Sequence, residues 1–180
     1  MHFLILVLSA LAGLAVWYMR LKAIGSAAKD IGKFAQRVRS APRKFAFMNR
    51  AGKTGLKAVR EPMEAGAILL VLMAGARANR ALAPRDKEAV FAQLSRVFDL
   101  DSEDASDLVS HATWMVRDVE LVSGVVLRMT QIVKQSPGIS APELVDLHEM
   151  LVAIAELDGQ PDEEQVLILD LYRQKVGLTV

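Results

Sequence analysis

Charge is sorted along this chain into three consecutive zones, and the sorting limits how the chain can fold. Residues 3–19 carry no charge, whereas residues 20–60 hold twelve Lys or Arg against one acid, Asp30. Residues 61–180 hold twenty Asp or Glu against ten Lys or Arg. The overall charge of +1 therefore hides a segment of +11 followed by one of −10. The chain divides into three predicted parts: an anchor at 1–22, a basic juxtamembrane helix and linker at 23–60, and a folded domain at 61–180.

The apolar run FLILVLSALAGLAVWYM is 17 residues long. As a helix it would extend roughly 25 Å, near the lower limit for crossing a bilayer. Trp17 and Tyr18 stand where an interfacial aromatic belt is expected. The cations follow this run instead of preceding it, which favours an uncleaved anchor over a secretory signal peptide. Because cationic flanks stay inside, we expect a single-pass protein of the inner (cytoplasmic) membrane, with the N-terminus outside and the C-terminal domain cytoplasmic.

The basic segment predicts contact with lipid. Its first cations recur at helical spacing, and each is worth about 1 kcal/mol beside anionic head groups. A segment tethered at a bilayer meets lipid before nucleic acid, so nucleic acid is not an expected partner. The linker from 40 to 55 contains AGKTG, but Phe47 stands where a phosphate-binding loop needs its first glycine. The predicted membrane-surface residues are Arg20, Lys22, Lys29, Lys33 and Arg37.

Composition and periodicity predict an all-α fold for the remainder. The chain is 52% apolar and only 6% aromatic, and it has no cysteine, which excludes disulfides and thiolate sites. Ser140 and Glu143 form a predicted capping box, and Gly177 a predicted helix end. Short polar connections between the helices predict a bundle. The expected helices are 62–78, 84–98 after Pro84, a segment within 99–116 behind an Asp or Ser cap, 119–135, a helix that follows the Ser140 cap and runs through 144–157, and 163–176.

Two helix pairs resemble each other at an offset of about 78 to 79 residues. Each has a buried helix with small residues, a tight polar turn and a second helix. The later turn, DGQPDEE, contains Asp158 and Gly159, and Asp162 caps the next helix. In the earlier copy Asn79 and Arg80 replace Asp-Gly. The pattern predicts an internal pseudo-repeat.

The motif A-x-x-D-G-x-x-D-x-x-Q at 155–165 resembles that of the TerB-like tellurite-resistance domain, over about residues 61 to 180. The resemblance implies a bacterial, helical, non-enzymatic module linked to membranes and stress, with acidic turns associated with cations. An anchor ahead of such a domain is also similar to membrane-anchored J-domain co-chaperones of the DjlA type. None of His2, His111 or His148 begins a His-Pro-Asp motif, so chaperone-stimulating activity is not implied.

The acidic turn has two interpretations. An EF-hand starting at Asp158 fails, since Glu163 replaces the required glycine and Leu169 the twelfth-position glutamate. A helix end, a turn and an N-cap account for nearly every residue. The alternative is a divalent-cation site that uses Asp158 and Asp162, although Arg80 would then bring a positive charge to it.

No catalytic constellation is apparent, so we expect no enzyme and no cofactor. His148 and Glu149 would begin a zinc HExxH motif, but position 152 is a valine. His111 shares a helical face with Asp104 and Asp107, where ordinary surface contacts are expected. We therefore expect a membrane-anchored adaptor that presents an acidic bundle to a protein partner. Two alternatives stay open: an accessory or assembly subunit of a larger membrane complex, and a divalent-cation sensor or metal-dependent enzyme.

Overall fold

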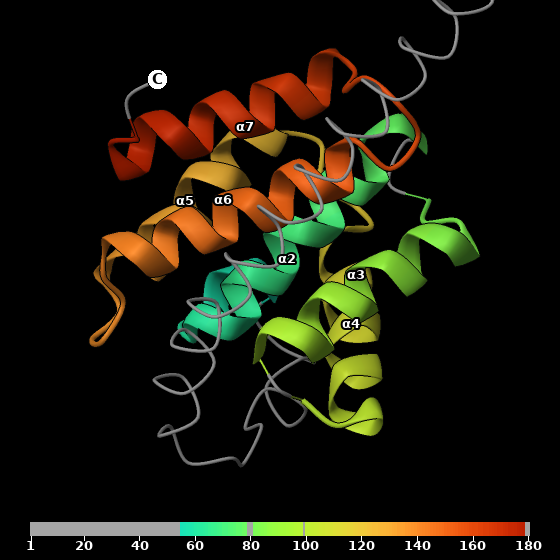
Figure 1. The fold of residues 1–180 in the computed structure, drawn as a ribbon, viewed down its shortest axis with the longest axis horizontal. Coiled ribbons are helices and arrows are strands. Elements are labelled where there is room, and N and C mark those ends of the chain that lie inside the picture. The colour runs from blue at the N-terminus through green and yellow to red at the C-terminus, as the bar shows by residue number, and fades with distance from the viewer. Residues whose placement is uncertain (1–54, 79–80, 99, 179–180) are drawn as a thin grey trace, which may run out of the picture.

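The protein is an all-α bundle in the part that the structure describes. The computed structural model describes residues 55–78, 81–98 and 100–178, and these contain helices but no strand (Figure 1). The predicted fold class is confirmed at this level. The elements are η1 (Gly55–Ala58), α2 (Pro62–Gly75), η2 (Ala76–Ala78), α3 (Pro84–Phe98), α4 (Ser102–Val116), α5 (Val122–Gln135), α6 (Ala141–Ala155) and α7 (Glu163–Val176).

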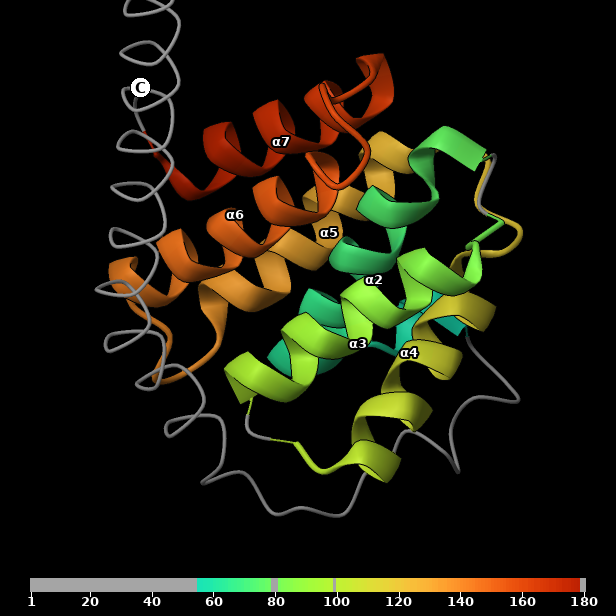
Figure 2. The ribbon, with the colours of Figure 1, turned by 45° about the vertical axis from the view of Figure 1, so that its right-hand side comes forward.

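Helix α2 is the centre of the bundle. Every residue from Glu64 to Gly75 is buried, and the apolar side chains surround the whole helix instead of one stripe. A helix that is hydrophobic all round must be enclosed by others. Helices α3, α4, α5 and α6 all pack against it, and α7 lies outside them against α5 and α6 (Figures 1 and 2). The acidic domain therefore has a core of its own.

Local capping chemistry sets most helix starts as expected. Pro62 begins α2, and the Asp101 side chain accepts a hydrogen bond from the Asp104 N–H at 2.8 Å. Ser140 and Glu143 form the predicted capping box of α6. At the other end of the chain, Gly177 closes α7 with a φ of 86°. These predictions are confirmed because each depends on a few consecutive residues.

The start of α5 differs from the prediction. The helix begins at Val122 instead of Val119, because the Val119 N–H donates to the Val116 carbonyl in the turn that ends α4. The residue before the helix is Leu121, which makes no side-chain cap. Without a cap residue, the sequence offers no local signal for this boundary.

The predicted anchor lies outside the residues that the structure describes. No helix among residues 55–78, 81–98 and 100–178 is long and apolar enough to cross a membrane. The anchor at 1–22 and the basic residues Arg20, Lys22, Lys29, Lys33 and Arg37 all lie outside the described residues. Packing begins slightly before residue 61, since Val59 is fully buried in the core.

Candidate functional site

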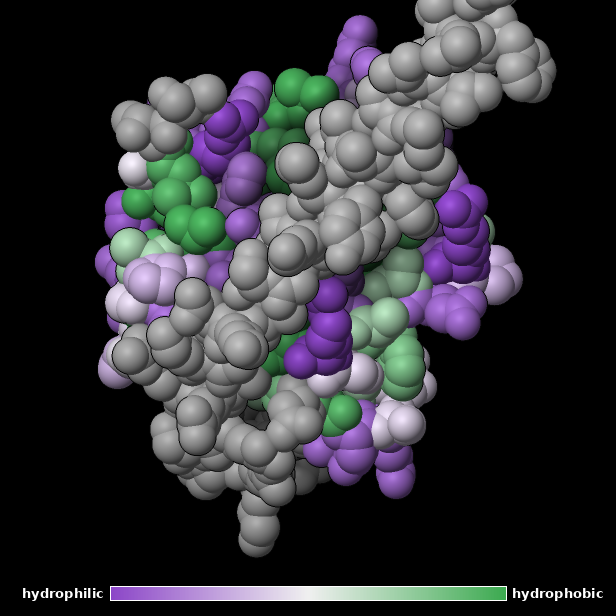
Figure 3. All heavy atoms as spheres, in the orientation of Figure 1, coloured by the Kyte–Doolittle hydropathy of each residue, from purple (hydrophilic) through white to green (hydrophobic). Residues whose placement is uncertain are grey.

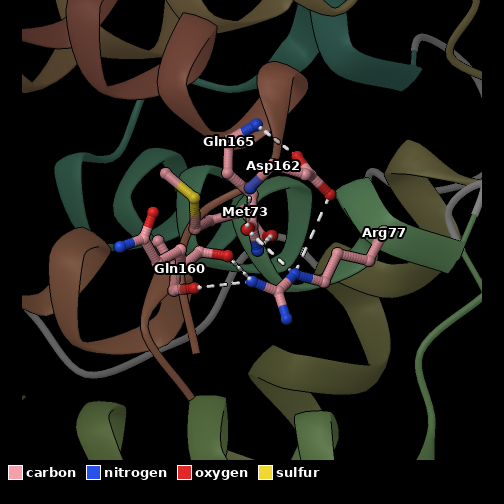
Figure 4. Close-up of polar contacts among 6 residues, drawn as sticks. Met73, Arg77, Gln160, Asp162 and Gln165 are labelled. Carbon is pink, nitrogen blue, oxygen red and sulfur yellow. Dashed lines mark hydrogen bonds and ion pairs between the residues drawn. The ribbon is translucent and has the colours of Figure 1, made fainter. Parts of the chain in front are cut away.

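The motif at 155–165 forms a polar cluster where the end of α2 meets the turn between α6 and α7. Figure 4 shows Arg77 pointing from the α2 side toward the backbone and side chains of this turn. We call these residues the α2–α7 polar cluster: Met73, Arg77, Ala155, Gln160, Asp162 and Gln165.

Asp162 caps α7 as the sequence predicts. Its carboxylate accepts a hydrogen bond from the Gln165 N–H at 2.8 Å, and the Gln165 side chain accepts one from the Asp162 N–H at 3.1 Å. This reciprocal pair is a capping box. The two acids that follow Asp162 lie in the first turn of the helix, where its dipole favours negative charge.

Gln165 also joins α7 to the central helix. The side chain is 2% exposed, and its Nε2 donates to the Met73 carbonyl at 3.2 Å. Met73 lies in the last turn of α2, where backbone carbonyls run short of helical N–H partners. One buried amide thus completes the capping box and satisfies the end of α2. This second role was not predicted, because the pattern of the motif indicates only the cap.

Arg77 brings a positive charge into the same cluster. Its Nε donates to the Gln165 Oε1 at 3.1 Å and lies 3.9 Å from the Asp162 Oδ2. Its Nη2 donates to the carbonyls of Ala155, at 3.4 Å, and Gln160 (Figure 4). A planar guanidinium can reach several acceptors at once, which a lysine cannot do in the same geometry.

Asp158 has a second arginine as its partner. The Arg85 guanidinium of α3 forms an ion pair with the Asp158 carboxylate and donates to the Leu157 carbonyl at 3.1 Å. The two side chains are 66% and 42% exposed, so solvent weakens the pair. Gly159 has a φ of 107°, which confirms the predicted glycine turn.

Each predicted cation ligand therefore faces a guanidinium. A small cavity of about 30 Å³, large enough to hold water, lies beside Arg77, Asp86 and Asp158. Among the described residues, no group of three or more His, Cys, Asp or Glu is arranged to hold a metal ion. Arg80, whose charge the sequence analysis placed here, lies outside the described residues. Among the described residues, Arg77 and Arg85 bring positive charge to the turn. Arg77 and Arg85 lie more than 70 residues from the turn in the sequence, so no local pattern could predict their contact with it.

A second polar pair lies inside the bundle and was also missed. The His111 Nε2 is 2.9 Å from the Glu64 Oε1, and both side chains are 10% exposed. Surface contacts were expected for His111, so this expectation is wrong: α4 turns the ring toward α2. A glutamate within the strongly apolar stretch of α2 was the available signal, since a buried carboxylate needs a partner.

His148 lies on the side of α6 that faces α7. Its ring stacks on the Tyr172 ring with centroids 6.1 Å apart, and its Nε2 is buried without a hydrogen-bond partner. Burial, with a smaller contribution from the charge of Arg173, lowers the pKa of His148 from its usual 6.5. Burial also raises the pKa of Tyr172, whose hydroxyl donates to the Leu144 carbonyl. The surroundings are those of a packed helix interface.

Several large apolar side chains remain at the surface. Trp114 of α4 is 47% exposed, and the adjacent Val166 and Leu167 of α7 are 44% and 45% exposed. Figure 3 shows hydrophobic patches interrupting the hydrophilic surface on one face of the molecule. Scattered apolar residues are ordinary on a protein surface, but an exposed tryptophan and an adjacent aliphatic pair are candidate contacts for other molecules.

The class that fold and site define is an all-α bundle whose acidic turn is held by arginines. Comparison with known proteins finds no matching family model, no matching curated protein and no matching solved structure. The TerB-like resemblance therefore stays a prediction drawn from the motif.

Proposed function

We propose that the chain is a membrane-anchored, non-enzymatic adaptor of the TerB-like type, with its acidic bundle in the bacterial cytoplasm and a link to stress responses. Residues 3–19 would anchor it, the following cations would lie against anionic lipid, and the bundle would be presented to a protein partner. One observation carries the proposal. An acidic bundle with its own complete core follows directly after an apolar run and a segment of +11.

The polar cluster supports a structural role for the motif residues. Asp162 and Gln165 start α7, Gly159 makes the turn, and Asp158 pairs with Arg85. In the alternative of another class, a cation sensor or metal-dependent enzyme, the ion would have to compete with two guanidinium groups. Coulomb repulsion at these distances opposes that binding.

The adaptor and the accessory-subunit alternative differ in which part of the chain holds the partners. An accessory subunit would pack its anchor against other spans, where Ser9, Ala12, Gly13 and Ala15 allow close helix approach. An adaptor would hold partners through exposed residues of the bundle, among which Val166 and Leu167 are the adjacent aliphatic pair.

Affinity purification of the tagged full chain in a mild detergent tests the proposal. One variant replaces residues 3–19 by an unrelated single span, and a second carries Val166→Ser with Leu167→Ser. We expect the main partner to be retained by the first variant and reduced in the second. Loss of all partners on exchange of the span would instead support the accessory subunit. A C-terminal reporter that is active only outside the cytoplasm would contradict the proposed topology.

A further inference from the structure

The outer face of α4 combines carboxylates with an exposed tryptophan. Glu103, Asp107, Ser110 and Trp114 follow one another at steps of three or four residues, which places them on one side of the helix. All four are exposed, and Trp114 is 47% exposed. No Lys or Arg occurs in α4, and Arg117 beyond its end is paired with Asp118. This face is therefore acidic with one aromatic ring at its C-terminal end.

A surface of this composition fits a basic segment that also carries apolar side chains. Carboxylates attract Lys and Arg, and the indole ring can stack with a guanidinium in a cation–π contact. A ligand with both kinds of group would pair with the carboxylates and cover the ring together. Charge complementarity therefore favours a cationic chain as the occupant.

The described part of the chain begins beside α4. The first described element, η1 (Gly55–Ala58), packs against α4, as Figure 2 shows. The preceding residues 37–53 contain six cations, no acid, and the two phenylalanines Phe45 and Phe47. Seventeen residues can reach up to about 55 Å when extended, whereas the α4 face from Glu103 to Trp114 is only about 17 Å long. The segment is thus close enough and long enough to lie along the whole face.

We propose that the outer face of α4 is a docking surface for the chain's own segment 37–53. Its cations pair with Glu103 and Asp107, and its phenylalanines and arginines cover Trp114. The same cations cannot lie against lipid head groups at the same time, so anionic lipid and α4 compete for them. This contact goes beyond the proposed function, since it requires only the charge and reach of the segment, and it can fail while the adaptor proposal holds.

Fluorescence quenching of Trp114 tests this contact in the full chain. The protein has two tryptophans, so Trp17→Phe leaves Trp114 as the only indole. In zwitterionic detergent micelles, acrylamide quenching should be weak at about 0.1 M salt and roughly twofold stronger at about 1 M, because the screening length falls from about 10 Å to about 3 Å. Nanodiscs that contain phosphatidylglycerol should raise the quenching relative to nanodiscs of phosphatidylcholine alone.

Two sets of variants identify the partners. Replacing the six cations of 37–53 by Gln should give strong quenching at both salt concentrations. Glu103→Gln with Asp107→Asn should reduce the salt effect, whereas the matched pair Glu163→Gln with Asp170→Asn on α7 should leave it unchanged. Equal quenching of the parent protein and the Gln variant at low salt, or no salt effect in the parent, would overturn the proposal. Shielding that disappears on dilution would overturn it in favour of a second copy as the occupant.

Discussion

The predicted pseudo-repeat pairs the turn before α3 with the turn before α7, and the two turns start their helices with different chemistry. Before α7, Asp162 and Gln165 form a complete capping box. Before α3, at an offset of 79 residues, only half of a box is present. The Ala83 N–H donates to the Asp86 carboxylate at 3.0 Å, but Ala83 has no side-chain oxygen that could accept a bond from the Asp86 N–H. Both helices begin with an acid or an amide at the same position, but only one has a cap side chain.

The difference also concerns charge. Arg77 and Arg85, which flank the turn before α3, both contact the turn before α7. At the same offset of 79, their counterparts are Glu156 and Glu164. The residues that flank the turn before α3 are thus positive and those that flank the turn before α7 are negative. The arginines of the first offset the negative charge of the second. These two arginines therefore join η2 and the start of α3 to the turn between α6 and α7.

The two turns should differ most in the stability lost when the third residue of the helix is replaced, which is Gln165 in α7 and Asp86 in α3. Gln165→Ala removes the capping bond and the buried donor to the Met73 carbonyl, so it should lower the free energy of unfolding by about 2–3 kcal/mol. Asp86→Ala removes one exposed bond and should lower it by about 0.5–1 kcal/mol. Thermal melts of the full chain in neutral detergent measure both. Equal effects would mean that the two boxes contribute alike and that the buried bond adds nothing.

A smaller effect is expected from exchanging cap residues. Asp162→Ala should destabilise by about 1 kcal/mol, and Ala83→Asp should stabilise by about 0.5–1 kcal/mol, since it supplies the missing acceptor. Gly159→Ala should cost about 1 kcal/mol, because its positive φ strains any residue with a Cβ. The same melts measure these variants. A destabilising Ala83→Asp would show that the first turn cannot accept a cap.

How far the sequence predicts this structure depends on the range of each interaction. Asp101, Ser140, Asp162 and Gly177 act within a few residues, and the helix ends that they set were predicted. Three contacts were missed: those of Arg77 and Arg85 with the turn before α7, and that of His111 with Glu64. They join residues that lie 47 to 88 positions apart in the sequence. Such contacts exist only once the helices are packed, so helical spacing alone cannot indicate them.

One position of the two helix pairs should differ in how it makes stability depend on pH. At the offset of 79, His148 corresponds to Leu69, which is fully buried. Because burial lowers the pKa of His148, the unfolded chain binds its proton more readily than the folded chain. The melting temperature should therefore fall as the pH drops through 6.5, the usual value, toward the lowered pKa.

His148→Leu should remove this part of the pH dependence. Leucine also removes the buried nitrogen that has no partner, so the variant should be at least as stable as the parent at neutral pH. Melts of both proteins across this pH range measure the difference. Parallel pH profiles for the two proteins would show that His148 does not contribute.

The smallest expected effect separates the two interpretations of the acidic turn. If arginines hold Asp158 and Asp162, millimolar calcium should not change the melting temperature. A bound cation at a tenfold excess over its Kd would instead add roughly 1.4 kcal/mol. Paired melts with calcium and with chelator measure this in the parent and in Asp158→Asn. A calcium-dependent rise that Asp158→Asn abolishes would contradict the arginine interpretation.

The arginines provide the matched control for this measurement. Arg85→Met removes a largely exposed ion pair, so its cost should stay below about 1 kcal/mol. It also frees the Asp158 carboxylate while the cap at Asp162 remains. If calcium stabilises Arg85→Met but not the parent, the guanidinium occupies the place that a cation would take in an open turn. If calcium stabilises neither, the geometry of the turn itself excludes the ion, and the arginine is only a surface partner.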